Sequence, residues 1–230
     1  MSRLRTLLQH ERRQAAVVAS LAFATILCTL MLVARAVYAD RVGHLGLQWN
    51  LFLAWLPMLG ALVAYNLGKR YGRRAWPLFL PFLAGWLLFF PNAPYILTGF
   101  INLAPRHGVP LWYDLLMIVT YALTGMFLGL VSLYLMQSLV RRAFDAVSSW
   151  VFTLGVLAIT GFGVYLGRFP RWNSWDLLTD PSALLTDIWA RLTNPLANGR
   201  TFVFSLLFSL CLAAMYFVMV SVIHLRDENG

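Results

Sequence analysis

Residues 111–136 read LWYDLLMIVTYALTGMFLGLVSLYLM, and Asp114 is the only charged residue among them. A helix needs about 20 apolar residues to cross a hydrocarbon core that is roughly 30 Å thick. This stretch meets that requirement without interruption. It therefore predicts a transmembrane helix, and it decides the fold class before any other part of the chain is considered.

Five other stretches have the same apolar character. Together they predict six spans, at Ala15–Ala34, Leu51–Leu67, Trp76–Leu97, Leu111–Met136, Val147–Leu166 and Phe202–His224. The composition agrees, because 60% of the 230 residues are apolar and 12% are charged, against roughly 45–50% and about 25% in soluble domains. The sequence predicts an all-α, polytopic transmembrane helix bundle. It excludes an ordinary soluble globule, a disordered chain and a disulfide-stapled secreted module.

The positive charge lies in short clusters between these spans. The formal net charge is +9, which in a soluble protein would suggest a nucleic-acid partner, but here eleven of the 18 Lys and Arg residues fall on the side of both termini. The positive-inside rule then predicts cytoplasmic termini, and we expect no nucleic-acid partner. The expected organisation is a basic cytoplasmic N-terminus at 1–14, a single transmembrane domain at 15–225 with an outer loop at 168–200, and a cytoplasmic tail at 226–230.

The first span has two interpretations. Val37, Tyr38 and Ala39 follow it with the small residues that a signal peptidase prefers. Its apolar run of about 20 residues is longer than the typical 7–15 of a signal-peptide core. An uncleaved anchor is therefore favoured, and a cleavable signal peptide is the alternative.

The long outer loop contains a helix signal. Asp180 and Pro181 form an N-cap followed by proline at the first helical position. We expect a helix from Pro181 to Leu192, lying along the outer membrane surface. A compact cap packed on the bundle is the alternative, and it would use the same apolar face. That face comprises Leu184, Leu185, Ile188, Trp189 and Leu192.

Small residues recur at four-residue spacing in three spans, which lets helix backbones approach closely. They are Gly60, Ala64 and Gly68, then Gly125 and Gly129, then Gly163 and Gly167. Packing within one bundle is the favoured interpretation. A homo-oligomer through these faces is the alternative.

Polar residues gather at the predicted outer ends of the third, fourth and fifth spans. Pro91 and Pro94 break helical hydrogen bonds below the outer surface, so freed carbonyls need a partner, and Asn92 is the nearest one. Asp114 and Arg168 carry opposite charges, and we expect them to pair within one pocket that also holds Asn92. The candidate ligand-binding residues are Asn92, Tyr95, Asp114, Arg168, Arg171, Asn173 and Asp176.

Three motifs at these ends resemble a known family. They are Phe90–Thr98 (FPNAPYILT), Trp112–Asp114 (WYD) and Gly167–Asp176 (GRFPRWNSWD). Together they are similar to a bacterial membrane family called domain of unknown function 1361, over roughly residues 50–225. The resemblance implies a multi-pass protein of the bacterial inner membrane and supplies no established activity. Gly99 and Asn102 stand where the family commonly has an Asp and a His, so no acid–base or metal role carries over to them.

Three functions remain open at this point. The first is binding of a lipid headgroup or small anion at the outer face, as such or within a transport pathway. The second is an enzyme acting on a lipid-linked substrate, with Asp114 or Asp176 as general base. The third is a structural or assembly subunit. We expect no cofactor and no metal, because no ligand spacing or nucleotide motif is present; membrane lipids are the expected partners.

Overall fold

The computed structural model describes residues 2–71, 76–104 and 108–227. Arg73, Arg74 and Arg106, which enter the charge distribution above, lie outside the described residues, as does 228–230 of the expected tail. The protein is 86% helical, without a strand in the described part. Six of its helical segments are long and apolar enough to cross a membrane. The predicted fold class, a bundle of six spans in an all-α chain, is confirmed.

The helices extend beyond the apolar runs that predicted them, because their ends enter polar sequence. The long ones are α1 (Ser2–Ala39), α2 (Leu45–Tyr71), α3 (Trp76–Phe89), α5 (Leu111–Ala143), α6 (Ala146–Arg168) and α9 (Gly199–Asp227). The short ones are α4 (Asn92–Tyr95), the 3-10 helix η2 (Ile96–Asn102), α7 (Asp176–Thr179) and α8 (Pro181–Thr193).

The third span is broken into three pieces. It runs over Pro81–Ile101 and combines the end of α3 with α4 and η2. Pro91 and Pro94 cannot donate backbone hydrogen bonds, so the regular α-helix ends at Phe89 and the chain continues in short turns. This break places α4 deep in the bundle, with Ala93 and Pro94 buried.

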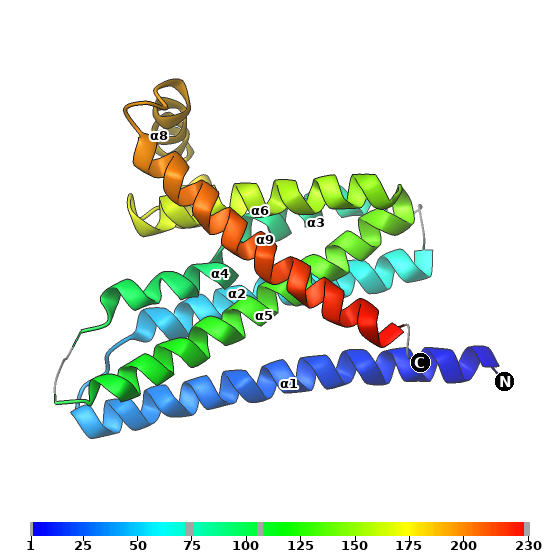
Figure 1. Ribbon diagram of the computed structural model, residues 1–230, viewed down its shortest axis with the longest axis horizontal. Helices are drawn as coiled ribbons and strands as arrows, with labels where there is room; N and C mark the ends of the chain where they lie inside the picture. Colours follow the sequence, from blue (N-terminus) through cyan, green and yellow to red (C-terminus); the bar gives the residue numbers. More distant parts are fainter. Residues whose placement is uncertain (1, 72–75, 105–107, 228–230) are drawn as a thin grey trace.

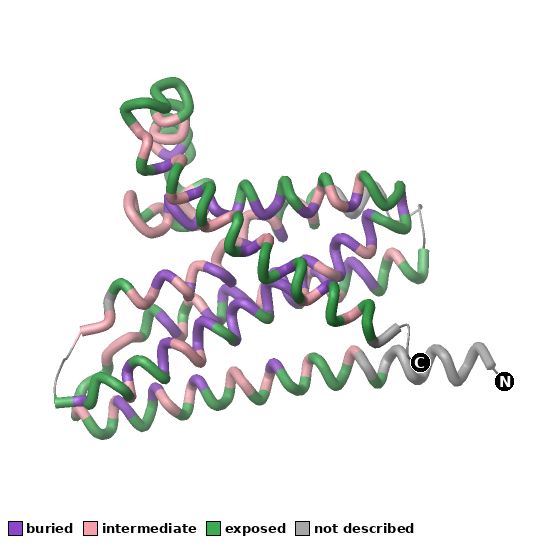
Figure 2. The backbone as a smooth tube through the Cα atoms, viewed as in Figure 1, coloured by how far each residue is buried: buried purple, intermediate pink, exposed green. Residues whose placement is uncertain are grey.

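α5 is the central element of the bundle. It packs against α1, α2, α4, η2 and α6, and Figure 2 shows buried residues along most of its length. α1 and α9 lie at the periphery and expose most of their apolar side chains. Exposed leucines and phenylalanines on such helices are expected where the surrounding solvent is lipid.

The small-residue faces pack inside the bundle. A Cβ on Gly125 would lie 2.7 Å from the Ala93 carbonyl oxygen, and one on Gly129 would lie 3.2 Å from the Ala93 side chain. A Cβ on Gly163 would lie 3.2 Å from the Pro91 ring, and one on Gly167 would lie 3.2 Å from the Tyr95 ring. The glycines of α5 and α6 therefore let both helices close around α4, which is the intramolecular packing that the sequence favoured.

Polar side chains connect the helices across the apolar interior. The Trp86 indole donates to Ser132 Oγ at 2.7 Å, and Ser132 in turn donates to the Pro57 carbonyl at 2.9 Å. Tyr216 donates to Gln137 at 2.6 Å and so ties α9 to α5. Such hydrogen bonds between helices are a main source of specificity where no hydrophobic effect drives helix association.

Two aspartates fix helix starts outside the spans. Asp145 accepts a hydrogen bond from the Ser148 amide at 2.6 Å, and this bond holds the pKa of that carboxyl below its usual value. Asp180 caps α8 through the Ala183 amide at 3.2 Å, with Pro181 as the first helical residue. The predicted helix after Asp180 is therefore present, and it lies across one end of the bundle rather than alongside α5 and α6 (Figure 1). We call this the α8 end.

The expected single apolar face of α8 is divided in the structure. Leu184 is buried and Ile188 is half-buried, whereas Leu185, Trp189 and Leu192 are exposed. The reason is that the polar face also contacts the protein. Asp187 accepts a hydrogen bond from the Trp172 indole at 2.8 Å, and Arg191 pairs with Asp187 and donates to Thr201. These bonds turn part of the apolar face outward.

Candidate functional site

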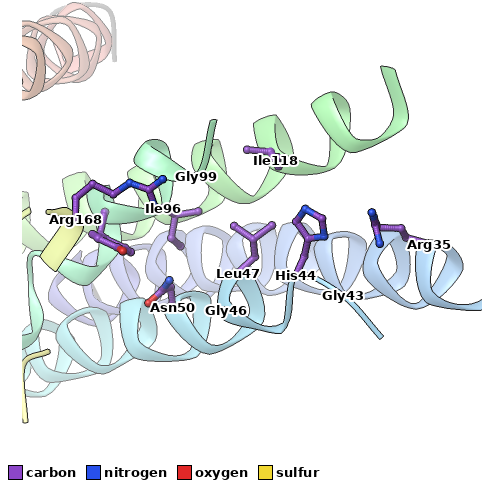
Figure 3. A pocket seen from close by; sticks show the side chains of 11 residues that line it. Arg35, Gly43, His44, Gly46, Leu47, Asn50, Ile96, Gly99, Ile118 and Arg168 are labelled. Atoms are coloured by element: carbon purple, nitrogen blue, oxygen red, sulfur yellow. The ribbon is translucent and has the colours of Figure 1, made fainter. Parts of the chain in front are cut away.

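A cavity of about 470 Å³ lies at the α8 end, between α1, α2, α4, η2, α5 and the end of α6. Its polar lining comes from Arg35, His44, Asn50, Tyr95 and Arg168. Figure 3 shows the two arginines at opposite ends of the cavity, with residues of α2 and the preceding loop between them in this view. No carboxylate is among the described residues that line it.

Arg35 is held by a buried ion pair with Asp114. Its Nε donates to Asp114 Oδ1 at 2.6 Å and its Nη2 to Oδ2 at 3.0 Å, and both side chains are 2% exposed. This two-point geometry fixes the guanidinium plane. The neighbouring Tyr113 hydroxyl donates to the Met31 carbonyl at 2.8 Å. The start of α5 is thus bound to α1 by two adjacent residues of the WYD motif.

The expected pair of Asp114 and Arg168 is corrected by this geometry. Both oxygens of Asp114 bond Arg35, which takes the place that the sequence analysis gave to Arg168. The expectation rested on consecutive spans being neighbours, whereas α5 packs on α1 as well as on α6. The predicted first span ends at Ala34, so it does not include Arg35. In the structure α1 continues to Ala39 and turns Arg35 inward.

A sequence signal for Arg35 did exist. Arg35 follows directly on an apolar run, and Asp114 opens another one, both at the same predicted membrane level. A buried charge at that depth requires a partner. The sequence therefore indicated that Asp114 needs a cation, but it offered both Arg35 and Arg168 without a means of choosing.

Arg168 lies in the last turn of α6 and is half-buried on the wall of the first cavity. A cation in the last turn of a helix is stabilised by the helix dipole. Arg168 also has an interaction with the rest of the protein. A guanidinium carries five donor hydrogens and stays protonated in proteins.

Asn92 closes the break in the third span, as expected. Its Nδ2 donates to the Phe89 carbonyl and to Ser174 Oγ, both at 3.0 Å. Ser174 in turn donates to the Leu88 carbonyl at 3.0 Å. These two side chains therefore satisfy the Leu88 and Phe89 carbonyls, while the Phe90 carbonyl accepts the Ala93 backbone amide at 3.1 Å. Asn92 and Ser174 thus join α4 to the loop after α6.

A second cavity, of about 630 Å³, adjoins the first. Asn92 and Asn173 lie on its wall, and Gly46, Asn50 and Tyr95 line both cavities. The expected single pocket for Asn92, Asp114 and Arg168 is therefore divided. Arg168 lines the first cavity, Asn92 lines the second, and Asp114 lies behind Arg35 and lines neither.

The remaining candidates lie in the loop after α6. Asn173 donates its backbone amide to the Asp176 carboxylate at 2.6 Å, so Asp176 closes a local turn just before α7. Arg171 is exposed, outside the described lining of both cavities, and its φ of 70° lies in the region that favours glycine. Of the predicted residues, the structure brings Tyr95 and Arg168 together on the first cavity and Asn92, Tyr95 and Asn173 on the second.

The comparisons with known proteins bear on this arrangement. A family model described as "Protein of unknown function (DUF1361)" matches residues 49–215. The chain belongs to the DUF1361 family. This confirms the resemblance based on the three motifs. No curated protein and no solved structure matches the chain. The DUF1361 region contains Asn50, Tyr95, Asp114 and Arg168, whereas Arg35 and His44 precede it.

The polar lining of the first cavity consists of side chains that can donate hydrogen bonds. They carry guanidinium, imidazole, carboxamide and phenol groups. Asp114 neutralises Arg35, so the positive charge of the wall is contributed by Arg168. Neither cavity carries a carboxylate among its described lining residues, and Asp114 and Asp176 are both engaged elsewhere. The enzymatic alternative therefore gains no general base from the geometry.

Proposed function

We propose that this multi-pass membrane protein binds a phosphate-like anionic group in the first cavity. The observation that carries the proposal is the pair of arginines, Arg35 and Arg168, brought from α1 and α6 to one cavity without a carboxylate in its described lining. Arginine is suited to this task because its planar donors match phosphate and carboxylate oxygens at two points.

The two arginines have different roles in this proposal. Arg35 is fixed by Asp114 and supplies a rigid wall beside Gly43, where a Cβ would lie 3.0 Å from Arg35 Nη1. Arg168, half-buried at the end of α6, supplies the charge that attracts the anion. Asn50 and Tyr95 add neutral donors to the lining. The anion is either free in solution or part of a lipid headgroup, since both present the same oxygens.

Replacement of Arg168 by glutamine should weaken phosphate binding. A hydrogen bond to a charged group is worth about 1.5–3 kcal/mol, so we expect roughly a 10- to 100-fold loss of affinity. The measurement is the rise in thermal stability of purified protein with inorganic phosphate, against chloride at equal ionic strength.

The matched control is Arg171→Gln, which changes an exposed arginine three residues away. It should leave phosphate binding at the wild-type level. Equal losses in both variants would show that surface charge rather than the cavity binds phosphate. A wild-type protein that is stabilised no better by phosphate than by chloride would refute the proposed function.

We further propose that the protein lies in the bacterial inner membrane with both termini in the cytoplasm. The unequal distribution of Lys and Arg supports this orientation. It places the α8 end and both cavities at the outer face. The pairing of Arg35 with Asp114 supports retention of the first span, because cleavage after Ala39 would remove the buried partner of Asp114.

Cysteine labelling tests the orientation. Val42 lies in the exposed loop between α1 and α2, and Ala146 is exposed at the start of α6, at the other end of the bundle. In a Cys211→Ser background, Val42→Cys should react with an impermeant maleimide on intact cells, and Ala146→Cys only after permeabilisation. The reverse pattern would invert the topology.

A further inference from the structure

The second cavity differs from the first in its chemistry. Its walls are mostly apolar and come from α3, α6 and α8, among others, with Leu87, Leu88, Phe162, Leu184 and Ile188 as representative residues. Among its polar side chains, Asn92 and Ser174 bond each other and backbone carbonyls, and Asn173 donates to Asp176. This cavity therefore offers apolar contact rather than charge.

The two cavities lie next to each other. Gly46, Asn50 and Tyr95 belong to the walls of both. A Cβ on Gly46 would meet nothing within 4 Å, so the backbone leaves space at this junction. A single molecule that passes this junction would place a charged end in the first cavity and an apolar end in the second.

The surroundings place the second cavity at the boundary between headgroups and hydrocarbon. Trp49 and Trp172 lie on its wall, and tryptophan concentrates at that level of a bilayer. The exposed side chains Leu185, Trp189 and Leu192 of α8 lie outside the same cavity. A helix with such a face is suited to lie at the membrane surface.

We infer that the ligand is a phosphate-bearing lipid, with its headgroup in the first cavity and one hydrocarbon chain in the second. This inference rests on the proposed anion site and adds the class of ligand. Charge complementarity selects the headgroup, because the Arg168 guanidinium lines the first cavity. The apolar wall selects the chain, because a hydrocarbon chain makes dispersion contacts with the apolar side chains that line it. The lipid also has a high effective concentration at the site, because it is confined to the same membrane.

Variants that fill the second cavity test the binding of the hydrocarbon chain separately from the binding of the headgroup. Ile188→Trp adds bulk at a half-buried position on the cavity wall, whereas Leu185→Trp adds the same bulk at an exposed position of the same helix. The probes are dioleoyl phosphatidylglycerol, titrated in nanodiscs and measured by native mass spectrometry, and soluble glycerol 3-phosphate, measured by calorimetry.

We expect Ile188→Trp to lower the affinity for phosphatidylglycerol roughly tenfold or more, since overpacking is costly. Its affinity for glycerol 3-phosphate should stay within about twofold of the wild type, as should both affinities of Leu185→Trp. Ile159→Trp, at another position on the wall, serves as a second filling variant if Ile188→Trp does not fold.

The outcomes distinguish this inference from the proposed function. If the wild type binds glycerol 3-phosphate but the filling variants bind the lipid as well as the wild type does, the ligand is a free anion and the lipid inference fails alone. If Ile188→Trp and Leu185→Trp weaken lipid binding equally, the effect belongs to the membrane surface and the inference also fails. If the wild type binds neither probe, the proposed anion site itself is refuted.

Discussion

Replacement of Asp114 by alanine should lower the free energy of unfolding by about 3–5 kcal/mol, the cost of removing one partner of a buried ion pair. The loss arises because Arg35, only 2% exposed, would keep its charge without its carboxylate. Both hydrogen bonds between the two side chains would also disappear. The measurement is titration with SDS in mixed micelles, followed by circular dichroism.

Two further variants make this result specific. Asp40→Asn changes an exposed aspartate near the same end of α1 and should have little effect. The double variant Arg35→Met with Asp114→Leu removes both charges and should recover much of the loss, because apolar replacement of a whole buried pair is often neutral or stabilising. A stability of Asp114→Ala equal to that of the wild type would show that Arg35 is solvated.

The Asp114 pair also bears on function. Arg35 forms part of the first cavity only while Asp114 holds its guanidinium plane. We therefore expect the double variant to fold but to bind phosphate more weakly than the wild type. In this sense Asp114 positions a residue of the site without lining the cavity itself.

Gly125→Ala should destabilise the protein by about 1–3 kcal/mol, the usual cost of overpacking. The new Cβ would lie 2.7 Å from the Ala93 carbonyl oxygen and 2.7 Å from Ile96 Cδ1. The isoleucine end can rotate away, but the carbonyl belongs to the backbone of α4 and can move only with it. Because α4 carries Asn92 and Tyr95, phosphate affinity should fall as well. SDS titration and the thermal phosphate assay measure both effects.

Gly155→Ala is the matched control for this substitution. Gly155 also lies inside a span, on α6, and a Cβ there would meet nothing within 4 Å. The change should leave stability unchanged or raise it by up to about 1 kcal/mol, because alanine favours a helix. Equal destabilisation by both substitutions would mean that glycine flexibility, rather than the close approach of α5 to α4, is required.

The sequence predicted those features that depend on local composition. The six spans follow from apolar runs, because only a helix satisfies all its own backbone groups within hydrocarbon. The helix after Asp180 follows from its cap and its proline, and the role of Asn92 follows from the two prolines beside it. Each of these depends on residues within a few positions of one another.

Within the site, the sequence located the level of the polar residues but not their partners. It placed Asn92, Tyr95, Asp114 and Arg168 at one end of the bundle, which the structure shows. It assigned Asp114 to Arg168 and left Arg35 outside the first span. The contact between α1 and α5 depends on how side chains fit along two helices that are separated by 71 residues, between Ala39 and Leu111. No local pattern encodes that fit.

What the sequence by itself determined is therefore the fold class, the number of spans and the family, since these follow from hydropathy and contiguous motifs. The tertiary structure alone decided that Arg35 pairs with Asp114, that α8 turns part of its apolar face outward, and that a polar and an apolar cavity share a wall. The physical reason is that every apolar helix face is equally stable against hydrocarbon. The arrangement of the helices is therefore selected by close glycine contacts and by a few hydrogen bonds and ion pairs between distant residues.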